Sequence, residues 1–124
     1  MAKKLRILHV DDDLDTLKVV KTILEKAGFE VVGVESGKKA LENIKSDHFS
    51  LILLDIMMPD MSGWDLFTRI SAIKPDYKVI FLTVLESSAQ KIKELKASGI
   101  MDYITKPFDN KDLVARVKRA IASK

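Results

Sequence analysis

The segment Leu51-Ile52-Leu53-Leu54-Asp55 sets four consecutive apolar residues directly before a carboxylate. An unbroken apolar run of this length is typical of a strand that is buried on both faces. Such strands occur in parallel sheets, whose connecting helices cover the sheet on either side. The segment therefore predicts a strand inside a parallel sheet, with Asp55 directly after its last residue.

The rest of the chain alternates in the same way between strand and helix signals. Four more β-like runs are expected at residues 5–10, 31–34, 79–82 and 101–105. Between them, apolar residues recur with the spacing of helices that bury one face. Gly28 is expected to end the first helix, while Ser36 and either Asp109 or Asn110 are expected to begin others. The expected inward residues are Leu14, Leu17, Val20, Ile23, Leu24 and Ala27; Ala40, Leu41 and Ile44; Leu66, Phe67, Ile70 and Ile73; Ala89, Ile92 and Leu95; and Leu113, Val114, Val117, Ala120 and Ile121.

This (βα)₅ pattern predicts an α/β fold with an open, doubly wound, five-stranded parallel sheet, because a (β/α)₈ barrel needs about twice this length. The chain has 124 residues, of which 47% are apolar and 31% are charged. These proportions favour a packed core over disorder. We expect one domain that covers residues 1–124.

Charge and composition exclude several classes of protein. The 21 Lys and Arg residues exceed the 18 Asp and Glu residues by only +3, so direct nucleic-acid binding is not expected. No apolar run approaches the roughly 20 residues that span a bilayer, and the first apolar stretch is too short for a signal peptide, so no membrane association is expected. The chain has no cysteine, which fits a cytoplasmic protein.

Polar residues follow four of the five expected strands. Asp11-Asp12-Asp13 follows the first strand, Asp55 the third, Thr83 the fourth and Lys106 the fifth. Each residue alone could be a helix cap, a turn residue or a surface charge. However, parallel strands end at one edge of a sheet, where ligands bind. Four such residues at four strand ends therefore indicate one shared site.

The carboxylates of this site predict a metal ion and a nucleophile. Two carboxylates about 4 Å apart repel each other by about 4 kcal/mol at an effective dielectric constant near 20, so the cluster needs a cation. Oxygen ligands of this kind suit Mg²⁺. A carboxylate beside Mg²⁺ can attack phosphorus and form an aspartyl phosphate, while Lys106 neutralises charge. Asp55 follows its strand alone and is the expected nucleophile, whereas Asp11 and Asp12 are suited to hold the metal.

Four motifs surround these strand ends. They are Val10-Asp11-Asp12-Asp13, Leu54-Asp55-Ile56-Met57-Met58-Pro59 with Gly63, Leu82-Thr83, and Tyr103-Ile104-Thr105-Lys106-Pro107-Phe108. Together they resemble the receiver domain of two-component response regulators, and the resemblance covers essentially the whole chain. It implies a flavodoxin-like fold with strand order 2-1-3-4-5. It also implies a phosphorylation-activated signalling switch, which is not a classical enzyme but catalyses its own Mg²⁺-dependent phosphorylation and dephosphorylation.

The resemblance assigns roles to individual residues of the site. It implies that Asp55 takes a phosphoryl group from a sensor histidine kinase or a histidine phosphotransfer protein. Mg²⁺ would be held by Asp12 directly, by Asp11 largely through water, and by Asp55 and the backbone carbonyl of Met57. Thr83 would hydrogen-bond the phosphoryl group and Lys106 would pair with it, while Tyr103 would change rotamer. The Lys106–Pro107 peptide bond would be cis.

Two further features bear on rate and output. Val84 stands where the family usually carries a small residue, which implies a narrower entrance for the phosphoryl group. The last helix resembles receivers of the winged-helix transcription-factor branch, which dimerise through the fourth helix, fifth strand and fifth helix. Asp102 and Arg116 occupy positions suited to a charge pair in such a dimer. The resemblance therefore implies that this face changes on phosphorylation and supports a phosphorylation-dependent homodimer.

Two alternatives remain open. A phosphatase of the haloacid dehalogenase type would use Asp11 as its nucleophile, but it also needs a carboxylate cluster late in the chain, which the sequence lacks. A receiver-shaped binding module that is never phosphorylated would not need the complete set of site residues that this sequence has.

Overall fold

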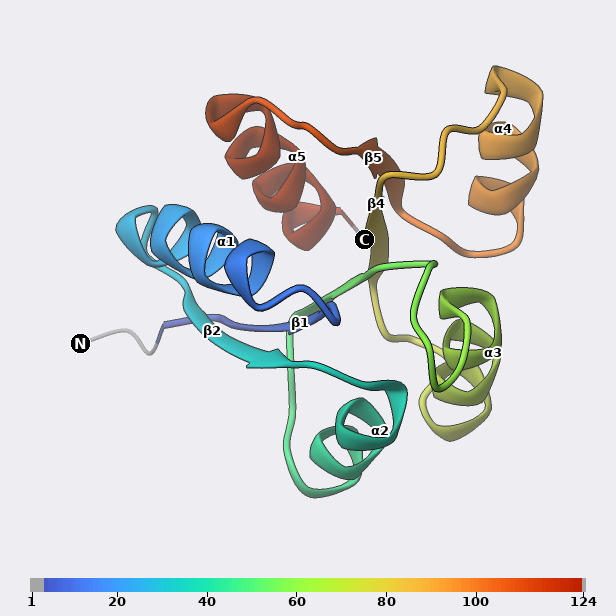
Figure 1. Ribbon diagram of the computed structural model, residues 1–124, viewed down its shortest axis with the longest axis horizontal. Helices are drawn as coiled ribbons and strands as arrows, with labels where there is room; N and C mark the ends of the chain where they lie inside the picture. Colours follow the sequence, from blue (N-terminus) through green and yellow to red (C-terminus); the bar gives the residue numbers. More distant parts are fainter. Residues whose placement is uncertain (1–3, 124) are drawn as a thin grey trace.

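The computed structural model describes residues 4–123 and contains five strands that alternate with five helices (Figure 1). The strand after each helix returns to the same sheet, as the alternating sequence pattern predicts. The elements are β1 (Arg6–Val10), α1 (Leu14–Lys26), β2 (Glu30–Val34), α2 (Gly37–Ser46), β3 (Leu51–Leu54), α3 (Gly63–Ile73), β4 (Val79–Thr83), α4 (Ala89–Ala97), β5 (Asp102–Thr105) and α5 (Asn110–Ala122).

The five strands form one parallel sheet in the order β2-β1-β3-β4-β5, which confirms the predicted fold class and strand order. β3 lies at the centre, between β1 and β4. Val10 pairs with Leu54, so β1 and β3 end level, and Leu54 pairs with Phe81, so β4 continues for two more residues to Thr83. This register brings the residues that follow these strands to one edge of the sheet.

Helices cover both faces of the sheet. α1 and α5 lie on one face, whereas α2, α3 and α4 lie on the other (Figure 1). Alternate residues of β3 contribute to two separate cores, since Leu51 and Leu53 pack towards α1 and α5, while Ile52 and Leu54 pack towards the opposite helices. All four residues are fully buried, which explains the unbroken apolar run.

Polar side chains begin every helix. Each of five residues directly before a helix accepts a hydrogen bond from a backbone N–H of the first turn, which pairs a donor that the helix itself cannot satisfy. Ser36 begins α2 as predicted, and of the two candidates for α5 it is Asp109 that does so. Gly28 follows α1 with a φ of 101°, a conformation that favours glycine. The five capping residues are Asp13, Ser36, Ser62, Ser88 and Asp109.

Several inward-facing predictions are wrong at the ends of helices. Leu14 is 57% exposed because it is the first residue of α1, beyond the end of β1. Ile73 ends α3 and is 40% exposed. In α4 the first residue, Ala89, is exposed, whereas Ile92 and Leu95 are partly buried and pack against the core as predicted. Helical spacing predicts which face points inward, but it does not predict how far the sheet extends beneath that face.

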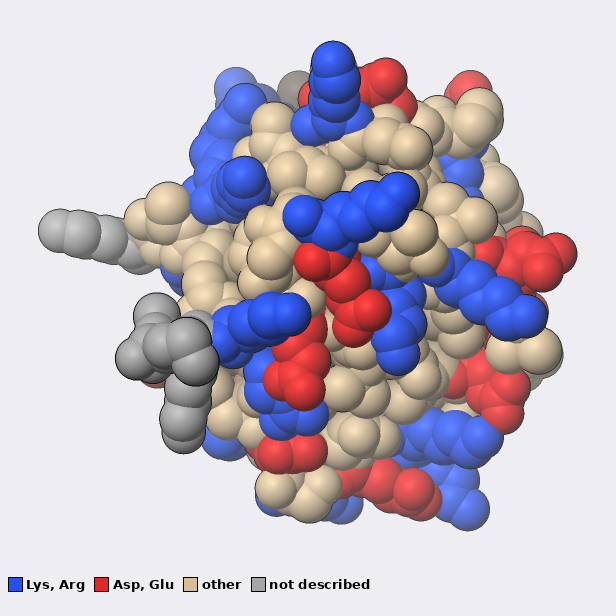
Figure 2. Space-filling view, turned by 90° about the vertical axis from the view of Figure 1, so that its left-hand side faces the viewer, with Lys and Arg blue, Asp and Glu red and all other residues tan. Residues whose placement is uncertain are grey.

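The surface agrees with the small net charge. Figure 2 shows the face on the left of Figure 1, where lysine and arginine side chains are interspersed with aspartate and glutamate. No large patch of one sign covers this face, as expected for an excess of only +3. Within residues 4–123, none of the helices combines the length and the apolar character needed to cross a bilayer.

Candidate functional site

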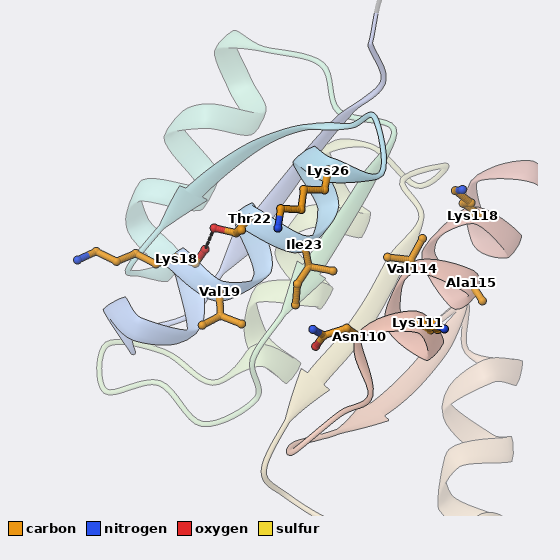
Figure 3. Close-up of a pocket in the computed structure, with 10 residues that line it drawn as sticks. All are labelled: Lys18, Val19, Thr22, Ile23, Lys26, Asn110, Lys111, Val114, Ala115 and Lys118. Carbon is orange, nitrogen blue, oxygen red and sulfur yellow. Dashed lines mark hydrogen bonds between the residues drawn. The ribbon is translucent and has the colours of Figure 1, made fainter.

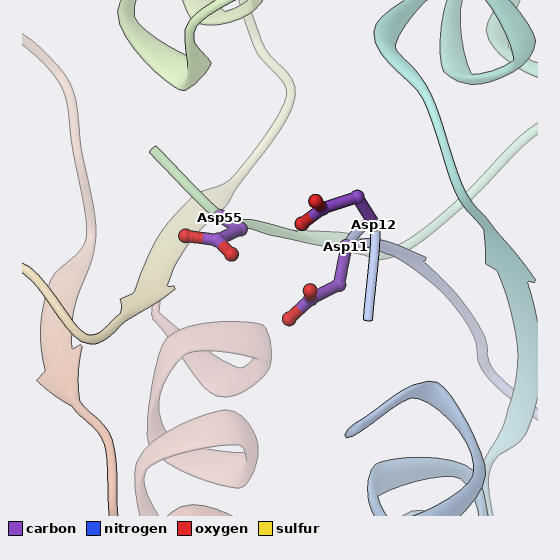
Figure 4. A group of neighbouring side chains, drawn as sticks. All are labelled: Asp11, Asp12 and Asp55. Carbon is purple, nitrogen blue, oxygen red and sulfur yellow. The ribbon is translucent and has the colours of Figure 1, made fainter. Parts of the chain in front are cut away.

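Three carboxylates meet at the carboxyl edge of the sheet. Asp11 and Asp12 follow β1 and Asp55 follows β3, and one oxygen of each lies within 4.8 Å of the others. Figure 4 shows the three side chains gathered where the two neighbouring strands end. The backbone fixes this placement, because the Asp55 N–H donates to the Val10 carbonyl at 3.0 Å. The predicted convergence of these residues is therefore present.

The three carboxylates differ in exposure. Asp12 is exposed, whereas Asp11 is fully buried and Asp55 is only 5% exposed. Backbone amides hold one oxygen of each buried group. The Asp13 N–H donates to Asp11 Oδ1 at 2.9 Å, and the Met57 N–H donates to Asp55 Oδ1 at 3.1 Å. The second oxygen of each buried carboxylate accepts from the ammonium group of Lys106.

Lys106 provides the positive charge of the site. Its Nζ lies 2.5 Å from Asp11 Oδ2 and 3.4 Å from Asp55 Oδ2, so it pairs more closely with Asp11. Burial raises the pKa of Asp11, although Lys106 and the Asp13 N–H act in the opposite direction. Three carboxylates and one ammonium group give the cluster a formal excess of two negative charges. Oxygen donors with this excess fit a divalent cation such as Mg²⁺.

A buried histidine lies next to this cluster. His9 is in β1, as the sequence predicts, but its Nε2 is 3.9 Å from Asp11 Oδ2. Neither ring nitrogen has a hydrogen-bond partner among the described residues. Burial, followed by the charge of Lys106, lowers the pKa of His9 from 6.5 to about 3, so the ring is neutral. The sequence could have indicated that His9 lies near the acidic cluster, because His9 is two residues before Asp11 and alternate residues of a strand point to one face.

Thr83 and Tyr103 lie on the two strands beyond β3. Thr83 ends β4, is fully buried and accepts a hydrogen bond from the Leu85 N–H at 3.3 Å. The Tyr103 hydroxyl donates to the Leu85 carbonyl and accepts from Ser87 Oγ at 3.3 Å. Its ring is 4% exposed and packs edge-on against Phe81, so it occupies the inward position. Local spacing does not predict the contact with Ser87, which lies 16 residues before Tyr103.

The loop after Asp55 is held by two contacts. Gly63 begins α3 so close to the strand end that an added Cβ would lie 2.5 Å from the Asp55 carbonyl oxygen, which excludes any side chain there. The Asp60 carboxylate accepts from the Gly37 and Lys38 amides, each at 3.2 Å, at the start of α2. The sequence indicated Gly63 through its motif. It did not indicate Asp60, because nothing in local spacing connects the loop with α2.

Exposed apolar side chains follow the central strands. Met57 is 55% exposed, Val84 57% and Leu85 38%, although all three are large hydrophobic residues. The first follows β3 closely and the other two follow β4. These side chains place apolar surface beside the strand ends, and the narrower entrance implied by Val84 stays a prediction. The Lys106–Pro107 bond is cis, as the resemblance implied.

The groove between α1 and α5 is a separate feature (Figure 3). It has a volume of about 750 Å³ and none of the described residues that line it is acidic. Four lysines contribute to it, at positions 18, 26, 111 and 118, together with apolar residues such as Val19, Ile23 and Val114. A metal-binding or phosphoryl-accepting role for this groove is therefore not supported, and the acidic cluster remains the functional site.

Comparisons with known proteins agree with this geometry. Residues 7–118 match the family described as the response regulator receiver domain. The chain is 35% identical over 116 residues to the response regulator receiver protein CpdR of Brucella abortus, covering 94% of this chain and 96% of CpdR. It is 40% identical over 123 residues to the transcriptional regulatory protein CrdR of Helicobacter pylori, covering 96% of this chain. This chain spans 55% of CrdR, so about half of that relative lies outside the comparison.

A solved structure extends the likeness to three dimensions. The response regulator TrrA of Thermotoga maritima, in complex with Mg²⁺ and beryllium fluoride, has a TM-score of 0.81 and 32% identity. The likeness covers 94% of this chain and 98% of TrrA. The family match, the relatives and the fold agree with one another and with the acidic cluster. This chain belongs to the response regulator receiver domain family.

Proposed function

We propose that Asp55 is the phosphoacceptor of this receiver domain. The observation that carries the proposal is the position of Asp55 at the end of the central strand, with Oδ1 held by a backbone amide and Oδ2 3.4 Å from Lys106 Nζ. In the reaction, an Asp55 oxygen forms a bond to phosphorus while the bond from phosphorus to the donor histidine nitrogen breaks. Lys106 then balances negative charge on the transferred group.

The acidic cluster supports a role for Mg²⁺ in this reaction. Asp11, Asp12, Asp55 and the backbone carbonyl of Met57 would hold the ion, and TrrA carries Mg²⁺ with beryllium fluoride. When bound, Mg²⁺ supplies positive charge that offsets the negative charge of the transferring phosphoryl oxygens. The chain itself orients the nucleophile, since the Met57 N–H holds one oxygen of Asp55 and Lys106 lies beside the other.

The proposed output begins at Thr83 and Tyr103. A Thr83 hydroxyl drawn towards a phosphoryl group would give up its contact with the Leu85 amide, next to the carbonyl to which Tyr103 donates. Arg116 of α5 donates to the Tyr103 backbone carbonyl at 3.1 Å. These contacts connect the phosphoacceptor edge with α5 and support a response of the α4–β5–α5 face.

Phosphorylation by a small donor tests the proposed function. Incubation with acetyl phosphate and Mg²⁺ is expected to add one phosphoryl group, which intact-mass spectrometry detects, and removal of Mg²⁺ with a chelator is expected to prevent the addition. An unchanged mass in the presence of both reagents would contradict the proposal and favour a binding module. Continuous release of phosphate from phosphomonoesters would instead favour the phosphatase.

Replacement of single carboxylates should rank the metal ligands. Asp12 is exposed and free to contact the ion, whereas Asp11 is fixed by Lys106 and the Asp13 amide. We expect Asp11→Asn to weaken Mg²⁺ binding about tenfold, as for an indirect ligand, and Asp12→Asn to weaken it more. Fluorescence of Trp64, the one tryptophan, can follow the titration. Asp15→Asn removes an exposed charge outside the cluster and serves as the control. Equal affinities for the Asp11 and Asp12 variants would refute the ranking.

The entrance should limit the rate of phosphorylation. Val84 is exposed beside the strand end, and its branched side chain restricts the approach that an alanine would leave open. We expect Val84→Ala to speed phosphorylation by acetyl phosphate several-fold, without a change in the final extent. Ile73→Ala, at an exposed β-branched residue at the end of α3 and outside the cavity that Val84 and Lys106 line, is the control. Identical rates for Val84→Ala and the wild type would rule out the restriction.

The receiver fold implies a histidine kinase as partner. We propose that the donor is a sensor histidine kinase or a histidine phosphotransfer protein, since both present a phosphohistidine. A phosphorylation-dependent homodimer through the α4–β5–α5 face is a further proposal. Within the structure Asp102 already pairs with Arg116 of the same chain, at 3.3 Å, and with Lys96 at 3.7 Å. The pair expected between subunits is thus formed inside one subunit, and dimerisation would have to exchange it.

Sedimentation can measure this dimer. A pair between subunits would replace the Asp102–Arg116 pair inside each subunit and so add little stability, and we expect a weak dimer that forms only after Mg²⁺ and beryllium trifluoride are added. Arg116→Glu should abolish it, because the reversed charge faces Asp102 and Asp112. Lys118→Glu makes the same change on α5 but lines the groove towards α1, and should leave the dimer intact. A monomer under all conditions would reject dimerisation and leave partner binding as the output.

A further inference from the structure

His9 occupies an unusual position for a polar residue. It lies in β1, two residues before Asp11, and its side chain is fully buried. Its two ring nitrogens are the only buried side-chain nitrogen or oxygen atoms without a hydrogen-bond partner in the part of the chain that the structure describes. On the same strand, Ile7 is equally buried and apolar. Packing alone therefore does not account for an imidazole here.

The chemistry of the ring makes this position unfavourable as it stands. A neutral imidazole carries one N–H and one acceptor nitrogen, and a buried donor without an acceptor destabilises the protein. The near acceptor is Asp11 Oδ2, which lies 3.9 Å from Nε2 and is beyond hydrogen-bond distance. That oxygen instead accepts from Lys106 Nζ at 2.5 Å. His9 is thus placed beside an acceptor that another donor occupies.

Phosphorylation would change which donor Asp11 needs. Lys106 is shared between two carboxylates, and its contact with Asp55 Oδ2 is already the longer of the two, at 3.4 Å. If Lys106 turns to a phosphoryl group on Asp55, the fully buried Asp11 Oδ2 loses its close partner. A shift of about 1 Å would bring the imidazole N–H to ordinary hydrogen-bond distance from the same oxygen.

We propose that His9 is a positioning residue that holds the Asp11 carboxylate through its Nε2–H when Lys106 pairs with the phosphoryl group. The inference rests on the proposed function, since it needs a phosphoryl group on Asp55. His9 is unpaired in one state and paired in the other. It therefore shifts the equilibrium towards the phosphorylated state, by about tenfold for one hydrogen bond to a charged group.

Three variants separate this role from packing. His9→Leu removes the donor and keeps an apolar side chain of similar size, while His9→Gln restores an N–H near the position of Nε2. Ile7→Leu changes the same face of the same strand without altering any polar atom. Each variant is titrated with beryllium trifluoride at saturating Mg²⁺, with Trp64 fluorescence as the signal, and its melting temperature is measured without these additions.

Opposite effects on the two states are expected for His9→Leu. Its dissociation constant for beryllium trifluoride should rise about tenfold, while its melting temperature should rise by about 4 °C because the unpaired N–H is gone. His9→Gln should recover most of the affinity, and Ile7→Leu should leave the affinity unchanged. A purely structural role would lower both stability and affinity together, and such a result would overturn the proposal.

Nuclear magnetic resonance of the wild type gives a measurement that no folding defect can obscure. The chain has two histidines, His9 and the exposed His48, so the ¹⁵N-labelled imidazole spectrum is simple. Beryllium trifluoride with Mg²⁺ should move the His9 Nε2–H proton downfield and slow its exchange, while the His48 signals stay in place. An unchanged His9 signal in a protein that binds beryllium trifluoride would overturn this inference alone. A wild type that binds none would contradict the proposed function as well.

Discussion

The Asp55→Asn variant is expected to take up no phosphoryl group under conditions that fully convert the wild type. An amide is not a nucleophile towards phosphorus, whereas the ionised carboxylate is. The substitution keeps an oxygen that can accept from the Met57 N–H and preserves the volume of the side chain, so the fold should survive. Intact-mass spectrometry after treatment with acetyl phosphate and Mg²⁺ measures the outcome directly.

The neighbouring carboxylates are not expected to replace Asp55. Asp11 is bound at both oxygens, by the Asp13 amide and by Lys106, and Asp12 is exposed and has no Lys106 contact among the described ion pairs. A phosphatase of the haloacid dehalogenase type would give the reverse pattern, with labelling retained in Asp55→Asn and lost in Asp11→Asn. Labelling of Asp55→Asn at the wild-type level would show that the nucleophile is another residue.

The fold could be predicted almost completely because each rule acts over a short stretch of sequence. The apolar run at Leu51–Leu54 is typical of a strand buried on both faces, and the alternation of strands and helices favours parallel strands with helices on either side. The burial of residues at the ends of each helix was not predictable in this way. Leu14 has the right spacing for an inward face, yet it lies past the end of β1 and is exposed. The burial of such a residue depends on whether the sheet and the neighbouring helices extend far enough to cover it, and local spacing carries no information about that.

The sequence predicts which residues of the candidate site lie together, but it does not predict which of them form ion pairs or hydrogen bonds. Parallel strands end at one edge, so Asp11, Asp55 and Lys106 could be placed together from their positions after strands. That Lys106 lies closer to Asp11 than to Asp55 depends on rotamers and on the conformation of the loop after β5. The same holds for Asp60 at the start of α2 and for the Asp102–Arg116 pair within one chain.

His9 shows why the environment of a residue matters more than its type. Its distance of two residues from Asp11 indicates that the two side chains point to one side, but only the structure shows that its ring nitrogens are buried without a hydrogen-bond partner among the described residues. Its neutral ring also has a consequence for stability. The pKa of His9 is lowered from 6.5 to about 3, because burial and the nearby Lys106 both disfavour the charged form. The folded protein therefore binds a proton at His9 less readily than the unfolded chain does.

Between pH 6.5 and pH 3 the unfolded state thus binds more protons at this site than the folded state, so acid favours unfolding. At pH 4 we expect His9 to have removed roughly 3 kcal/mol of the stability present at pH 7. Asp11 acts in the opposite sense, since its raised pKa lets the folded state bind a proton first. A comparison of variants is therefore needed, because the wild-type profile contains both contributions.

Urea unfolding of the wild type and of His9→Leu, each at pH 7 and pH 4, isolates the contribution of His9. The wild type should lose about 3 kcal/mol more than His9→Leu over this interval, since only the wild type carries an imidazole that must stay neutral to remain buried. Ile7→Leu retains His9 and should follow the wild type. If His9→Leu and the wild type lost equal stability, the imidazole would have to accept its proton as readily in the folded protein as in the unfolded chain. A charged ring at this position would be buried beside Lys106 without a hydrogen-bond partner. The nearby carboxylate oxygen, Asp11 Oδ2, lies 3.9 Å from Nε2 and already pairs with the ammonium group.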